Sequence, residues 1–90
     1  MLYPYVTLND NTEIVHSETL ADGSVKVYIE TPDAKDCFHH MTVYLPSYRV
    51  EEVYKYTKEE VDKYMQFIHR NAHLIIQFAA QGGFENAEVV

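Results

Sequence analysis

The first half of the chain alternates hydrophobic and polar residues with a period of two, which is typical of strands with one buried face. Together with the turn residues between its segments, this alternation predicts strands over residues 5–8, 12–19, 24–30 and 37–45. Asp22-Gly23 is a strong hairpin signal, because glycine accepts a positive φ without a Cβ clash. Residues 48–54 fit either a fifth strand or an irregular crossing. The pattern therefore predicts a small antiparallel meander of three to five strands.

Strand alternation also sorts the residues of "CFHHMTVYL" onto two faces. The more aliphatic set is expected to face the core, and it consists of Cys37, His39, Met41, Val43 and Leu45. His40 falls on the other face with Phe38 and Tyr44. Cys37 and His39 are thus expected to share a face that His40 does not.

The hydrophobic period changes to three and four residues after Thr57, which indicates an α-helix. Thr57 and Glu60 fit a capping box, and Gly82-Gly83 provide the residues that commonly end a helix. A helix is predicted over residues 58–81, either continuous or broken near residues 70–71, because Asn71 can end one helix or cap another. The chain is expected to form one α+β domain over residues 1–90, with this helix packed on the sheet and a short tail over residues 84–90.

The second half of the predicted helix carries hydrophobic residues around more than half of its circumference. One small sheet is not expected to cover all of them, and the simplest additional cover is a second copy of the chain. The sequence therefore predicts a homodimer whose helical contacts include Phe67, Leu74, Ile75 and Phe78. In the alternative, the sheet curls around the helix and Phe84 and Val89 cover the rest.

Composition and charge narrow the classes of function. The formal net charge is -7 and the seven basic residues are scattered, which opposes binding to a nucleic-acid backbone. The N-terminus lacks the features of a secretory signal, and no stretch approaches the roughly twenty apolar residues of a membrane span. With a single cysteine, these observations predict a cytoplasmic protein that binds neither nucleic acid nor membrane.

Eight tyrosines are present, and several of them crowd the middle of the chain. Tyrosine offers contact area with a polar tip, so Tyr48, Tyr54 and Tyr56 are interface candidates on an acidic surface that suits a basic protein partner. The alternative is that these tyrosines simply cover the outer face of a small sheet.

One cluster of residue types suggests a metal site. His69 and His73 lie four residues apart on the helix, which is the spacing used when a helix gives two imidazoles to zinc. With Cys37 and His39 they would complete a tetrahedral zinc site. However, Arg70 occupies the position of the general base in the metalloprotease pattern, so a solvated helix edge explains the two helical histidines equally well.

No catalytic motif is present, and Cys37 follows Asp36, which disfavours a reactive thiolate. The sequence thus predicts a non-enzymatic protein-binding or regulatory module acting as a homodimer, without a cofactor. The alternative hypothesis is a metal-binding or metal-sensing protein that uses the four Cys and His residues.

Overall fold

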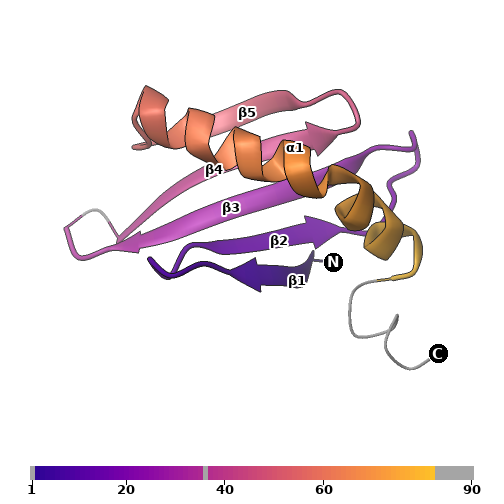
Figure 1. Cartoon of the computed structure of the whole chain (residues 1–90), viewed down its shortest axis with the longest axis horizontal. Coiled ribbons are helices and arrows are strands. Elements are labelled where there is room, and N and C mark those ends of the chain that lie inside the picture. The colour runs from indigo at the N-terminus through magenta and orange to yellow at the C-terminus, as the bar shows by residue number, and fades with distance from the viewer. Residues whose placement is uncertain (1, 36, 83–90) are drawn as a thin grey trace.

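The computed structural model describes residues 2–35 and 37–82, which form a five-stranded antiparallel sheet and one helix (Figure 1). The strand order is β1-β2-β3-β4-β5, so every strand pairs with its neighbour in the chain. The elements are β1 Leu2–Thr7, β2 Glu13–Ser17, β3 Val25–Asp33, β4 Cys37–Leu45, β5 Arg49–Tyr54 and α1 Lys58–Ala80. The prediction of an α+β meander followed by a long C-terminal helix is confirmed, and the ambiguous residues 48–54 are mostly strand.

β1 differs from its prediction because it begins at Leu2 rather than at residue 5. Pro4 does not interrupt it, since β1 is an edge strand and one side of its backbone needs no ladder partner. The register between β1 and β2 shifts between Pro4 and Val6, which leaves Tyr5 at a bulge. β1 therefore bends where Tyr5 meets the helix.

The core lies between the sheet and α1, and the face predicted from strand alternation is confirmed for its aliphatic members. Val27, Ile29, Met41 and Val43 are all 0% exposed. His39 is only partly buried, although its ring contacts Tyr56 of the core, and Cys37, which has a positive φ of 69° at the start of β4, is exposed.

The helix begins with the predicted capping box. The Thr57 hydroxyl accepts from the amide of Glu60 at 3.1 Å, and the amide of Thr57 donates to the Glu60 carboxylate at 2.9 Å. The helix is continuous, so the possible break near residues 70–71 does not occur. Asn71 is held within it by its own side chain, which donates to the carbonyl of Phe67 at 2.9 Å and accepts from the Tyr5 hydroxyl at 2.7 Å.

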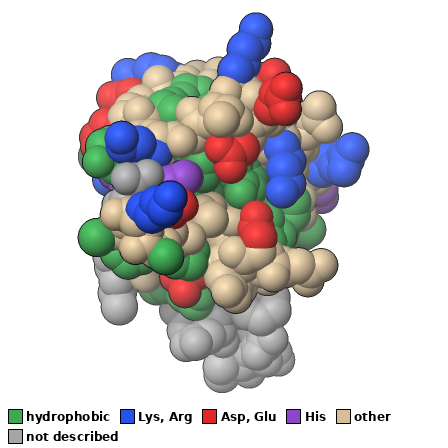
Figure 2. Space-filling model, turned by 90° about the vertical axis from the view of Figure 1, so that its left-hand side faces the viewer, with side chains coloured by type: hydrophobic (Ala, Val, Ile, Leu, Met, Phe, Trp, Pro, Cys, Tyr) green, Lys and Arg blue, Asp and Glu red, His purple; other side chains and the backbone are tan. Residues whose placement is uncertain are grey.

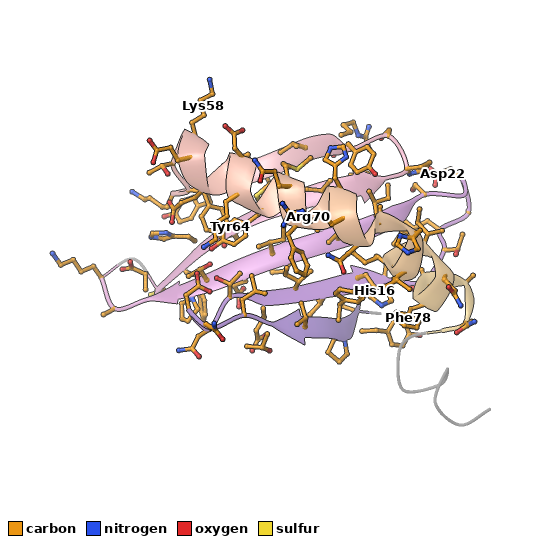
Figure 3. The ribbon with its side chains drawn as sticks, viewed as in Figure 1. His16, Asp22, Lys58, Tyr64, Arg70 and Phe78 are labelled. Atoms are coloured by element: carbon orange, nitrogen blue, oxygen red, sulfur yellow. The ribbon has the colours of Figure 1, made fainter. Side chains whose placement is uncertain are left out.

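α1 crosses one face of the sheet diagonally, from β5 and β4 near its start toward β2 and β1 near its end (Figure 1). Phe67 and Phe78 both contact the ring of Tyr5, with centroid distances of 6.4 and 6.1 Å. Figure 3 shows Phe78 near the end of α1, beside β1 and β2. Ile75 is 0% exposed within the chain's own core, so its assignment to a subunit interface is wrong.

Tyr5 of β1 thus packs against two residues of the second hydrophobic stripe of the helix, Phe67 and Phe78, within the same chain. The expected contributions of Phe84 and Val89 lie outside the described residues. No helix within the described ranges is long and apolar enough to cross a membrane.

Candidate functional site

The structure does not bring together the four residues predicted to share a metal ion, Cys37, His39, His69 and His73. His69 stacks on Tyr48, which lies in the turn after β4, with ring centroids 3.8 Å apart. His39 instead lies near the start of β4, 3.4 Å from the Asp33 carboxylate. The intervening strand spans on the order of 20 Å. Among residues 2–35 and 37–82, no three His, Cys, Asp or Glu side chains could hold an ion together, so the shared site is wrong.

Cys37 is exposed and occupies the first position of β4, where it lies opposite Asp33 of β3 in the strand register. Its positive φ turns it out of the strand alternation, away from the core position expected for it. No other cysteine is found among residues 2–35 and 37–82, so no described partner for a disulfide is present.

The predicted interface residues differ in how far they are exposed to solvent. Tyr56 is 8% exposed and belongs to the core, so its interface assignment is wrong. Tyr48 is partly buried against His69, and Leu74 is also partly buried. Tyr54, at 46%, is the one exposed member of the predicted set.

Tyr54 belongs to the sheet face opposite α1, which we call the open face. It carries the residues that alternate with the core positions, among them Val15, Tyr28, Glu30, Phe38, His40, Thr42, Tyr44 and Tyr54. Three rings form a row across β3, β4 and β5: Tyr28 stacks on His40 at 5.8 Å, and His40 stacks on Tyr54 at 5.1 Å. Tyr28 and Tyr54 thus cover part of the outer face of the sheet, which is the alternative that the sequence offers to an interface role for its tyrosines.

Acidic groups lie beside this row of rings. The Tyr28 hydroxyl donates to Glu30 Oε2 at 2.9 Å. Burial, the hydrogen bond to Glu30 and the charges of Glu30 and Glu52 raise the pKa of Tyr28 to about 12. One end of the row therefore sits in a negative field.

A hollow of about 280 Å³ opens next to Glu30 on the same end of the open face. Glu13 and Glu30 lie directly opposite each other on β2 and β3, and Pro32 and Phe38 form apolar walls. Like charges directly opposite on neighbouring strands destabilise a sheet. Neither carboxylate forms an ion pair within the described part of the chain. The hollow thus combines two uncompensated carboxylates with an aromatic ring.

A chain of buried hydroxyl groups lies on the other side of the sheet, under the start of α1. The Thr31 hydroxyl is 2.7 Å from Tyr56 Oη and 2.6 Å from the Thr12 hydroxyl, which is 3.1 Å from Tyr64 Oη. Tyr64 donates to Asp10 Oδ2 at 3.2 Å. Ionised Asp10 can only accept hydrogen bonds. Each hydroxyl group of the chain therefore donates its proton to the neighbour that lies closer to Asp10. The hydrogen bonds from Thr12 and Tyr64, with nearby Lys63, lower the pKa of Asp10.

Tyr56, at the buried end of this hydroxyl chain, is expected to make the stability of the protein depend on pH in the alkaline range. Burial raises the pKa of Tyr56 to about 12 from an ordinary value of 10.0. The folded state therefore keeps a proton that the unfolded state loses, so the stabilisation is complete below pH 10 and is lost as the pH rises to 12. Denaturant titrations across this range are expected to show a steep loss of stability in the wild type and a shallower one in Tyr56→Phe.

Tyr54→Phe, which removes an exposed phenol, is the matched control for this pH series. A wild-type profile that Tyr56→Phe leaves unchanged would contradict the assignment to Tyr56.

Comparison with known proteins gives no match: no family model, no curated protein and no solved structure is significantly similar to this chain.

Two groups of residues escaped the sequence analysis. Glu13 and Glu30 are seventeen positions apart, and only the register of β2 and β3 places them side by side. Asp10, Lys63 and Arg70 meet around a groove that depends on the path of the helix across the sheet. No local pattern marks either group, although Glu13 and Glu30 both fall on outward positions of predicted strands.

Proposed function

We propose that this protein is a small non-enzymatic binding module of the cytosol that recognises a basic segment of a protein partner on its open face. An arginine or lysine side chain of the partner enters the hollow between Glu13 and Glu30. The rest of the segment lies along the row formed by Tyr28, His40 and Tyr54. The observation that carries this proposal is the uncompensated pair of carboxylates opposite each other beside an aromatic wall.

The charges of the hollow support a cationic ligand. Glu13 and Glu30 repel each other in the free protein, so a cation placed between them relieves that repulsion as well as adding its own attraction. The formal net charge of -7 adds long-range attraction for a basic partner.

The aromatic rings support the same class of ligand. Phe38 is 47% exposed at the wall of the hollow, and Tyr54 is 46% exposed at the far end of the row. Guanidinium and ammonium groups bind the faces of aromatic rings. The open face already contains such a contact, since the guanidinium of Arg49 lies 4.7 Å from the centre of the Tyr44 ring.

Binding of a hexa-arginine peptide, measured by calorimetry at physiological salt, tests the proposal. The double variant Glu13→Gln/Glu30→Gln is expected to weaken binding about tenfold, from two exposed charge pairs of roughly 0.7 kcal/mol each. The same variant is expected to stabilise the free protein by roughly 0.2–1 kcal/mol, because it removes the like-charge pair.

The matched control is Glu59→Gln/Asp62→Asn, which removes the same net charge from exposed positions of α1. It is expected to weaken the peptide complex much less. Equal losses in the two variants would show that the peptide responds only to net charge, and would reject the hollow as the binding site.

The homodimer expected from the sequence stays a prediction. It rests on the second stripe of α1, in which Phe67 and Phe78 contact Tyr5 of the same chain. Exposed hydrophobic residues do remain on the edge strand β5, where Val50 and Val53 are 37% and 45% exposed. These two side chains support a partner or a second copy at that edge.

A further inference from the structure

A groove of about 490 Å³ lies between the β1–β2 turn and the first half of α1. Residues 7–10 form one wall, and Lys63, Gln66, Phe67 and Arg70 form the other. The groove exists because α1 crosses the sheet diagonally and leaves the corner beside this turn uncovered (Figure 1). Its volume falls within the range of small-molecule sites, about 300–1,000 Å³.

The two cations of the groove are in different states. Lys63 Nζ lies 3.8 Å from Asp10 Oδ2 and 5.3 Å from the centre of the Tyr64 ring. Asp10 is also fully engaged, since its carboxylate accepts from the amide of Thr12 at 3.1 Å and from the Tyr64 hydroxyl at 3.2 Å. The one acidic residue of the lining is therefore paired with Lys63 and hydrogen-bonded.

Arg70 is the second cation of the groove, and in the described part of the chain it is not paired with Asp10. Within residues 2–35 and 37–82 its guanidinium forms no ion pair and no hydrogen bond. It lies seven residues after Lys63, two turns along the same flank of α1, at a rise of about 10 Å. Figure 3 shows Arg70 near the middle of the helix and Tyr64 closer to its start at Lys58. The groove thus carries a local excess of positive charge on a protein whose formal net charge is -7.

Apolar side chains form part of the lining between the charges, beside the polar Thr7, Asn9 and Gln66. Leu8 and Phe67 are partly buried side chains that pack against the core while lining the groove, and Tyr64 lies beneath them at 1% exposure. Hydrophobic and charged side chains are interspersed over this end of the molecule (Figure 2). This combination of a cation and apolar side chains favours a ligand with an anionic group and an apolar body.

We propose that this groove binds a small organic carboxylate. The carboxylate pairs with the Arg70 guanidinium, whose planar fork matches two carboxylate oxygens, and the apolar body lies on Leu8 and Phe67. This site is separate from the hollow between Glu13 and Glu30, which has the opposite charge.

Cinnamate is the probe for this site, and cinnamamide is the matched neutral compound. A titration followed by amide resonances is expected to show saturable binding of cinnamate with a Kd of about 1 mM or below, centred on residues 7–10 and 63–70. Cinnamamide is expected to bind at least about tenfold more weakly, because it lacks the charge that pairs with Arg70.

Arg70→Gln is expected to weaken cinnamate binding about tenfold, whereas Arg49→Gln is the matched control on β5 and is expected to leave it unchanged. Arg70 is exposed, so its variant is expected to keep the wild-type melting temperature. Equal binding of cinnamate and cinnamamide, equal losses in the two arginine variants, or no saturable shifts at these residues would each overturn the proposal.

Discussion

Replacing Ile75 by alanine is expected to lower the free energy of unfolding by about 2–5 kcal/mol, as for other buried aliphatic residues truncated in a core. Ile75 is 0% exposed and packs between the sheet and the helix, so the truncation leaves a cavity within a single chain. The loss is therefore expected to be independent of protein concentration. Urea titrations at several concentrations measure both quantities.

Ile76→Ala is the matched control, because it makes the same chemical change at the next residue. Ile76 is 36% exposed, and its truncation is expected to cost well under 1 kcal/mol. A loss in Ile75→Ala that depends on protein concentration would instead support the subunit interface predicted from the sequence. In that case the wild-type midpoint would rise with protein concentration, and Ile75→Ala would remove this dependence.

Tyr64→Phe is expected to destabilise the protein by about 1–3 kcal/mol, although it deletes a single oxygen atom. The Tyr64 hydroxyl joins Thr12 to Asp10, and all three groups lie under or beside the helix. Without it, the buried Thr12 hydroxyl loses one of its partners. The phenylalanine ring keeps its contact with Tyr56, whose centroid is 5.1 Å away, so the loss reports the hydrogen bonds rather than the packing.

A double-mutant cycle that combines Tyr64→Phe with Thr12→Val measures the interaction energy between the two hydroxyl groups, apart from the contribution of each residue alone. Because Thr12 and Tyr64 bond directly, the two losses are expected to be non-additive by at least about 0.5 kcal/mol. Tyr54→Phe removes an exposed hydroxyl and is expected to change stability by no more than about 0.5 kcal/mol. If Tyr64→Phe matched this control, the hydroxyl chain would contribute nothing to stability.

The two proposed sites lie on different parts of the molecule and carry opposite charge. The hollow between Glu13 and Glu30 belongs to the open face, whereas the Arg70 groove lies on the side of the sheet that α1 covers. Thr7 at the end of β1 lines both, and the turn after it contributes Asp10 to the groove and Asn11 to the hollow, whereas Arg70 lines only the groove and Glu13 and Glu30 only the hollow. Each site can therefore be tested with a variant that leaves the other unchanged.

Local signals account for the parts of the fold that the sequence predicted well. The capping box of Thr57 and Glu60 depends on residues three apart, and the observed helix begins at Lys58, as expected. The burial of Val27 and Val43 follows from strand alternation, which needs only neighbouring residues. β1 begins three residues earlier than predicted and contains Pro4, which an edge strand tolerates; sequence alone does not show that this strand lies at the edge.

The metal hypothesis failed for a related reason. Strand parity and helical spacing say which face a residue occupies, but not how far along the element it meets its neighbours. The hypothesis requires the strand face of His39 to pack against the helix flank of His69, yet His39 lies by Asp33 and His69 by Tyr48, at opposite ends of β4. The side chain of Cys37 was also misplaced, because its positive φ is not encoded by strand alternation.

The sequence by itself determined the antiparallel meander of the first four strands, the capped helix that follows, and the aliphatic residues of β3 and β4 that face the core, because periodicity and capping act over a few residues. Only the tertiary structure decided that Tyr5 covers Phe67 and Phe78, that Glu13 faces Glu30, and that a groove opens between Arg70 and the β1–β2 turn. These features depend on strand register and on the diagonal path of α1. Both are set by the packing of the whole core rather than by any local stretch of residues.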